Sequence, residues 1–177
     1  LFVAGHDTTA GAMSWTLALL SKNPEARERL HAEVDGLATD ATLAESNLPY
    51  TQQVIDESMR LYPPSWLVVR TPREPDTICG YSVPKGAPLL ISQYVMHRHP
   101  DLWEDPERFD PDRFAPKRAA ARPHYAYFPY GGGGRKCIGI AFAQIAIRLT
   151  IASVCRRYEL NLAPGHSLVP QPLITLR

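Results

Sequence analysis

The sequence has 177 residues, of which 45% are hydrophobic and 21% are charged, as in an ordinary globular domain. We therefore expect one domain with a sizeable core. A formal net charge of +1 gives no electrostatic reason to expect nucleic acid or an anionic membrane as a partner. The three cysteines form neither a CxxC pair nor a zinc-finger spacing, so a reduced interior is the default expectation.

The chain opens with an apolar stretch that predicts a buried helix over residues 1–21. The stretch has neither an N-cap nor the basic region of a signal peptide. His6 and Asp7 also make it a poor membrane span. The far end, "PLITLR", has the alternating pattern of a strand. We expect residues 1–177 to form a single partial domain of a longer protein.

Two further helices are predicted in the first third of the chain. One begins at Pro24, with Asn23 as its N-cap, and ends at Gly36. The next begins after Leu48, at Pro49, and ends before the prolines at 63 and 64.

Most of the 17 prolines lie between Pro49 and Pro129, which predicts a loop-rich middle. Short runs between Trp66 and Met96 predict strands and hairpins. Residues 97–134 have too much proline for regular structure and too many aromatic residues for disorder, and such long ordered loops are usually functional. A last apolar helix is predicted over residues 138–160. The fold class expected is mainly α with small β-sheets.

Cys137 lies where a glycine run meets this last helix, in "YGGGGRKCIG". Helix N–H groups and the basic Arg135 and Lys136 favour a negative charge nearby, so Cys137 is a candidate thiolate that could act as a nucleophile, redox centre or metal ligand. No histidine base is evident, and the phosphate-loop pattern GxxxxGK[ST] is not matched. Glycines at 131–134 would let the backbone lie against a large planar group. The alternative is a flexible turn with an inert cysteine.

Glu57 and Arg60, in "ESMR", are three residues apart and share a helical face, so they can pair. Apolar neighbours favour burial, and Arg113 in "FDPDRF" could supply the further partner that a buried pair needs. The alternative is a solvated pair of little consequence.

The first helix contains a polar patch in "AGHDTTAG". Thr8 can bond back to the carbonyl of Ala4 and open the helix locally. Asp7 and Thr8 could then relay protons to a small bound molecule. The alternative is a core helix with a tolerated polar patch.

Together these segments resemble the C-terminal half of a cytochrome P450, a haem-thiolate monooxygenase, in the family's order and over essentially the whole chain. "AGHDTT" resembles the oxygen-activation motif, which makes Asp7 and Thr8 its acid–alcohol pair. "ESMR" and "FDPDRF" resemble the ExxR and PERF-type elements. The resemblance therefore assigns a structural triad: Glu57, Arg60 and Arg113.

"YGGGGRKCIG" resembles the family's haem-binding loop, with Cys137 at the position of the proximal iron ligand. The implied cofactor is haem b, with Arg135 and Arg70 as candidates to contact its propionates. The other cofactor-binding positions that the resemblance implies are Tyr130, Gly131, Gly133 and Gly139. The family usually has Phe where this chain has Tyr130, and the added hydroxyl could change thiolate donation and the reduction potential.

The resemblance implies insertion of one atom of O2 into a small, lipophilic organic substrate, with electrons from a ferredoxin or a flavoprotein reductase. Alternatives are a family member that uses peroxide or rearranges its substrate, and a haem protein without catalysis. A third is that these residues alone are inactive, since the family's N-terminal half supplies many substrate contacts and part of the haem pocket. The location would be cytoplasmic for a soluble bacterial type, and membrane-anchored only if a preceding segment carries an anchor.

Overall fold

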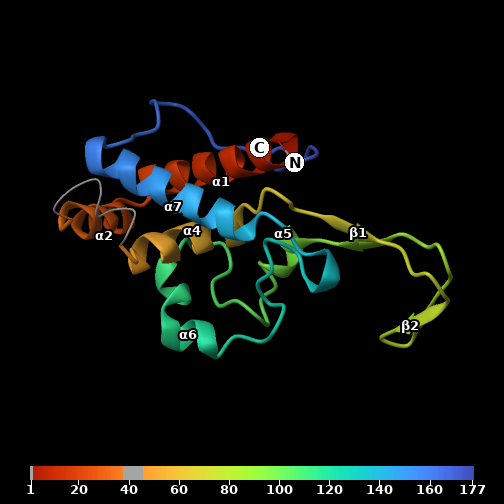
Figure 1. Ribbon diagram of the computed structural model, residues 1–177. Coiled ribbons are helices and arrows are strands. Elements are labelled where there is room, and N and C mark those ends of the chain that lie inside the picture. The colour runs from red at the N-terminus through yellow and green to blue at the C-terminus, as the bar shows by residue number, and fades with distance from the viewer. Residues whose placement is uncertain (1, 38–45) are drawn as a thin grey trace.

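The computed structural model describes residues 2–37 and 46–177 and has the predicted mainly helical architecture with small antiparallel sheets (Figure 1). The longer helices are α1 (Phe2–Lys22), α2 (Pro24–Asp35), α4 (Pro49–Leu61) and α7 (Ile140–Arg157). The shorter ones are α5 (Gln93–Met96), α6 (Pro116–Ala120) and the 3-10 turns η1 (Pro111–Phe114) and η2 (Gly133–Arg135). The strands are β1 (Val68–Arg70), β2 (Asp76–Ile78), β3 (Tyr81–Val83) and β4 (Leu89–Ile91).

The core lies among the four long helices. α1 packs against α7, α4 and α2, and α7 also packs against α2 and α4. Leu30, Val34, Val54 and Ile151 are fully buried there. Each lies on the apolar side of its helix. These sides face one another because removal of apolar surface from water is the main driving force for folding.

Helices α2 and α4 begin at Pro24 and Pro49, as the sequence predicts. Pro24 and Pro49 each occupy the first turn of a helix, where a missing N–H breaks no hydrogen bond. Asn23 is the N-cap residue of α2, as predicted, but its side chain makes no capping bond. Its Nδ2 instead donates to the carbonyl of Leu19 in the preceding helix.

The expectation that α1 is buried throughout is wrong for its first turns. Ala4 and His6 are exposed, and full burial begins at Ala12. The other segments that the structure describes pack over only the later turns of α1, where Leu19 and Leu20 face the core. Residue 1 lies outside the described residues.

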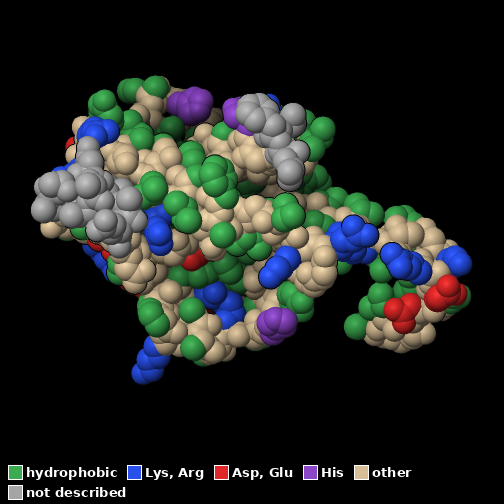
Figure 2. All heavy atoms as spheres, in the orientation of Figure 1, with side chains coloured by type: hydrophobic (Ala, Val, Ile, Leu, Met, Phe, Trp, Pro, Cys, Tyr) green, Lys and Arg blue, Asp and Glu red, His purple; other side chains and the backbone are tan. Residues whose placement is uncertain are grey.

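The middle of the chain forms two hairpin pairs, β1 with β4 and β2 with β3. Cys79 and Gly80 form the tight turn of the second pair, with φ of 50° and 85°. This hairpin is an arm that projects from the body (Figure 1). Charged side chains of both signs gather on the arm (Figure 2).

Three details of the predicted strands and loops are corrected. Residues 93–96 form the short helix α5 instead of a strand, because Ser92 caps it by accepting a hydrogen bond from the N–H of Val95. The proline-rich loop contains η1 and α6, each with proline in its first turn. The alternating C-terminal segment forms only an isolated bridge between Pro172 and Leu176.

Candidate functional site

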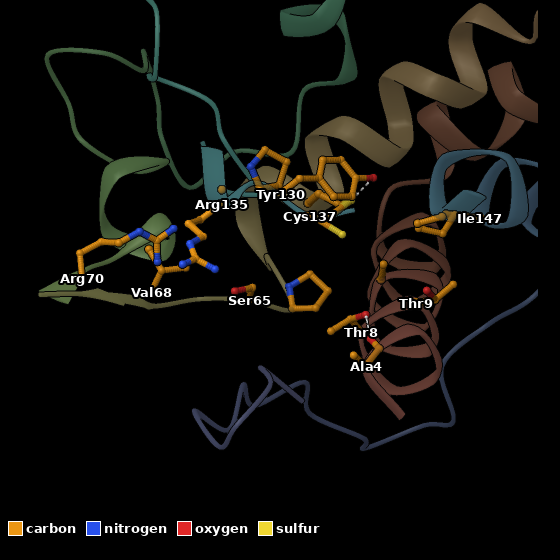
Figure 3. A pocket seen from close by; sticks show the side chains of 16 residues that line it. Ala4, Thr8, Thr9, Ser65, Val68, Arg70, Tyr130, Arg135, Cys137 and Ile147 are labelled. Atoms are coloured by element: carbon orange, nitrogen blue, oxygen red, sulfur yellow. Dashed lines mark hydrogen bonds between the residues drawn. The ribbon is translucent and has the colours of Figure 1, made fainter. Parts of the chain in front are cut away.

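A cavity of about 320 Å³ lies where α1, α4, β1, α7 and the loop of residues 129–137 meet (Figure 3). Its walls are mostly apolar, and Ala4, Ala12, Val68 and Ile147 contribute to them. No Asp or Glu of the described residues lines this cavity. The polar side chains on its wall include Thr8, Arg70, Tyr130, Arg135 and Cys137.

Cys137 is an exposed free thiol on the cavity wall. Its backbone N–H donates to the carbonyl of Tyr130 at 2.9 Å, which closes the loop that carries the thiol. α7 begins three residues later, at Ile140, with Gly139 as its N-cap residue. This backbone hydrogen bond therefore positions Cys137 close to the N-terminus of α7.

The glycines of this loop are needed for its backbone path. Gly131 and Gly133 have φ of 73° and 67°, in the left-handed region that favours glycine. A Cβ at Gly132 would lie 2.5 Å from the ring of Tyr125, so any side chain there would require this half-exposed ring to move. A Cβ at Gly131 would instead point into open space, so the backbone beside the cavity is bare and accessible.

Arg70 and Arg135 line the same end of the cavity, away from α1 (Figure 3). Arg70 ends β1, and its Nη1 donates to the carbonyl of Val69 at 2.9 Å. Because both guanidinium groups reach the same space, this end can bind carboxylate groups. Cys137 and Ile147 lie farther along the same cavity, toward α1 (Figure 3).

Thr8 lies on the cavity wall that α1 provides, and its hydroxyl donates to the carbonyl of Ala4 at 2.7 Å, as expected. Asp7 lines a separate cavity of about 430 Å³. Its carboxylate accepts hydrogen bonds from the hydroxyl of Thr175, at 2.6 Å, and from the guanidinium of Arg177. The bond from Thr175 is the largest influence that lowers the pKa of Asp7, and Arg177 adds to it. The structure therefore does not bring Asp7 and Thr8 together on one wall.

Glu57 and Arg60 form a fully buried, bidentate ion pair within α4. The two bonds are 2.7 Å (Nε to Oε2) and 2.9 Å (Nη2 to Oε1). Arg113 adds a third charge, with its Nε 3.4 Å from Oε1 of Glu57. Burial raises the pKa of the Glu57 carboxyl, and the hydrogen bond from Arg60 opposes that rise.

This triad joins α4 to the long loop. The N–H of Asp110 donates to Glu57 at 2.9 Å. Arg60 donates to three loop carbonyls, those of His97, Pro106 and Arg108. These bonds satisfy the N–H groups of Arg60 and the acceptor capacity of Glu57 that the buried ion pair leaves unused.

The cysteine loop is also held by three residues that were not predicted from the sequence, namely Asp56, Met59 and Tyr127. The hydroxyl of Tyr127 donates to Oδ1 of Asp56 at 3.0 Å, and burial raises the pKa of both groups. The hydroxyl of Tyr130 donates to Sδ of Met59 at 3.4 Å. Both bonds run from the loop to α4. Tyr127 and Asp56, like Tyr130 and Met59, lie 71 residues apart, so no local pattern could have predicted them.

His97 fixes the same loop from the other side. Its Nε2 accepts a hydrogen bond from the N–H of Phe128 at 3.0 Å, and its ring packs against Tyr127 and Phe128. Burial, with a contribution from the charge of Arg60, lowers the pKa of His97 to about 3. The ring is therefore neutral at physiological pH and acts as an acceptor.

Comparison with known proteins identifies relatives along the whole chain. The family model described as Cytochrome P450 matches residues 1–173. Cyclooctatin synthase of Streptomyces melanosporofaciens is 41% identical over 179 residues, which cover 99% of this chain and 39% of that protein. The taurochenodeoxycholic 6 alpha-hydroxylase of Sus scrofa is 42% identical over 175 residues, which cover 96% of this chain and 34% of that protein.

A crystal structure of a cytochrome P450 (CYP102L1) superposes with a TM-score of 0.90 at 29% identity, covering 99% of this chain and 42% of that one. The chain thus spans about two fifths of the length of the proteins it matches. None of the helices in the part of the chain that the structure describes combines the length and the hydrophobicity of a membrane-spanning segment.

Proposed function

Because the chain belongs to the cytochrome P450 family, we propose that it acts as a haem-thiolate monooxygenase that inserts one oxygen atom of O2 into an organic substrate. Membership of the family implies a haem cofactor. The observation that carries the proposal is the cavity itself, on whose wall the Cys137 thiol, two guanidinium groups and the Thr8 hydroxyl meet.

The residues around this cavity fit haem b. Its apolar walls suit a porphyrin, and the bare backbone at Gly131 leaves room for a flat ring to approach. Cys137 would supply the iron ligand. Arg70 and Arg135 would hold the two propionates as charge-assisted pairs. When bound, the haem supplies activation of O2 and transfer of the oxygen atom.

The protein's part in the reaction is to position the thiol and to move protons. The triad of Glu57, Arg60 and Arg113 acts structurally, since it ties the long loop to α4 away from the cavity. We assign proton transfer at the cavity to the Thr8 hydroxyl. Asp7 could act with Thr8 only in an arrangement in which its carboxylate leaves Thr175 and Arg177, because here it lines the other cavity.

A small, lipophilic substrate is supported by the apolar part of the wall near Ala4, Ala12 and Val68. The relatives include a cyclooctat-9-en-7-ol 5-monooxygenase, 40% identical over 169 residues. Electrons would come from a redox protein, a ferredoxin or a flavoprotein reductase. The hydroxyl of Thr8 on the wall favours use of O2 over use of peroxide, because a peroxide reaction needs no proton relay to O2.

The direct test is the absorption spectrum of the haem-loaded, reduced protein under carbon monoxide, beside Cys137→Ala. We expect a strongly red-shifted Soret band in the wild type that is lost in the variant. Cys79→Ala is a matched control, because this thiol is exposed on the distant hairpin arm. A histidine-like band that is unchanged in Cys137→Ala would refute the proposal.

A further inference from the structure

Tyr130 lines the same cavity as the Cys137 thiol and carries a hydroxyl where phenylalanine is usual in the family. That hydroxyl donates to Sδ of Met59 at 3.4 Å, the bond drawn as a dashed line at Tyr130 in Figure 3. Tyr130, Met59 and Cys137 all line the same cavity. Two sulfur atoms, the thioether of Met59 and the thiol of Cys137, therefore lie on the wall that Tyr130 also lines, and the thioether accepts the hydroxyl proton.

Met59 is buried in the core at this position. It lies in α4 between Glu57 and Arg60, and only 3% of it is exposed. It belongs to the main core cluster, and Tyr130 packs against the same cluster. The hydroxyl therefore meets an acceptor whose place is determined by the core and by the buried ion pair.

Tyr130 is also coupled to Cys137 through the backbone, since its carbonyl accepts the N–H of Cys137 at 2.9 Å. The charge of the Cys137 side chain also acts on the Tyr130 hydroxyl. Burial is the main cause of the raised pKa of Tyr130, and the nearby charges of Asp56 and Cys137 add to it. A change in the direction of this hydroxyl would thus act on the cysteine that the proposed function assigns to iron.

A tyrosine hydroxyl has one proton to donate. A buried donor without a partner is unfavourable, so the proton must go to some acceptor. A thiolate is a stronger acceptor than a thioether, because hydrogen bonds to charged groups are stronger. Without Met59, the proton would turn to the Cys137 sulfur and withdraw electron density from it.

We propose that Met59 is a positioning residue that holds the Tyr130 hydroxyl away from the Cys137 sulfur, so that the tyrosine leaves the thiolate as electron-rich as a phenylalanine would. This inference rests on the proposed function. It goes beyond that function in naming the residue that neutralises the effect of the unusual hydroxyl.

The test is a double-mutant cycle on the haem-loaded protein, with the reduction potential and the position of the carbon monoxide Soret band as readouts. Met59→Leu should shift the potential to a more positive value, because the freed hydroxyl reaches the thiolate. Tyr130→Phe should keep the wild-type potential. Met59→Leu in the Tyr130→Phe background should produce no shift. Met13→Leu is the matched control, since Met13 packs against the same core cluster but does not line the cavity.

Two outcomes would overturn the inference. One is a potential in Tyr130→Phe that differs from the wild type, which would mean that the hydroxyl already acts on the sulfur. The other is a shift by Met59→Leu that is absent or that persists without the hydroxyl. The wild-type carbon monoxide spectrum separates these results from failure of the proposed function. A wild type with the thiolate band and no shift in Met59→Leu refutes only the role of Met59, whereas a wild type without that band refutes the haem-thiolate assignment.

Discussion

Asp7 and Thr8 are neighbours on α1, yet their side chains line two different cavities. The Thr8 hydroxyl lies in the cavity that contains Cys137, and the Asp7 carboxylate is held by Thr175 and Arg177. Successive side chains on a helix point about 100° apart, so adjacent residues readily face different surroundings. The acid therefore also has a structural role, because it ties the C-terminal segment to α1.

We predict that Asp7→Asn lowers the thermal midpoint at pH 7. The hydrogen bond from Thr175 and the charge of Arg177 lower the pKa of Asp7, so its stabilisation is fully present above the ordinary value of 3.8. The stabilisation is lost as the pH falls through the lowered pKa that Asp7 has in the folded protein. The difference in thermal midpoint between Asp7→Asn and the wild type should thus be equal at pH 5 and pH 7 and should shrink below pH 3.8. Ser14→Ala, in the same cavity, is the control and should show no such pH dependence.

Loss of the buried Glu57 carboxylate should lower the free energy of unfolding far more than loss of the exposed Asp112 carboxylate. Glu57→Ala leaves Arg60 buried without its partner, and we expect the free energy of unfolding to fall by about 3–5 kcal/mol, with loss of bound haem. Arg29 and Asp112 form a bidentate pair whose side chains are 45% and 47% exposed. Asp112→Ala should lower the free energy by at most about 1 kcal/mol. Urea unfolding measures both, and similar losses would contradict the structural role of Glu57.

His97 should make the protein sensitive to mild acid. Its folded pKa of about 3 lies below the ordinary 6.5, so the unfolded chain binds the proton first as the pH falls. The stabilisation is present above pH 6.5 and declines toward pH 3, by about 1.4 kcal/mol for each pH unit. His97→Gln keeps an acceptor for Phe128 and does not titrate. Its unfolding free energy should depend less steeply on pH between 6.5 and 4.5, and an unchanged slope would show that other groups dominate.

Gly131→Ala should destabilise the cysteine loop by about 1–2 kcal/mol, because φ at this residue is 73°. Gly134→Ala is a close control, since Gly134 does not have a positive φ and its Cβ would also meet open space. We expect weaker haem retention in the first variant and nearly unchanged retention in the second. Thermal unfolding and haem titration measure the two effects. Equal behaviour of the variants would mean that backbone conformation is not the constraint.

Removal of a guanidinium group from the cavity should weaken haem retention. For Arg70→Gln and Arg135→Gln we expect transfer of haem to apomyoglobin to be faster by roughly tenfold or more each, since a charge-assisted hydrogen bond contributes about 1.5–3 kcal/mol. Arg73→Gln is the control, because Arg73 is exposed and lies outside the cavity. Loss rates that match the control would remove these residues as propionate contacts.

Local sequence was enough to determine the helices and one part of the site. Pro24 and Pro49 predicted two helix starts because proline fits only the first turn without loss of a hydrogen bond. Glu57 and Arg60 were predicted to pair because a spacing of three residues places them on one face. The glycine run before Cys137 was informative because its positive φ angles favour glycine. All three are properties of neighbours along the chain.

The rest was decided only by tertiary structure. Asp7 meets Thr175 and Arg177, which lie 168 and 170 residues away, and Met59 meets Tyr130 across 71 residues. The direction of a helical side chain follows from its position, but its partner depends on which distant segment covers that face. The sequence by itself therefore determined which chemical groups the protein carries and most of its helices. The packing of distant segments decided that Thr8 lines the cavity of the Cys137 thiol, that Asp7 lines another cavity, and that the Tyr130 hydroxyl has a thioether as its acceptor.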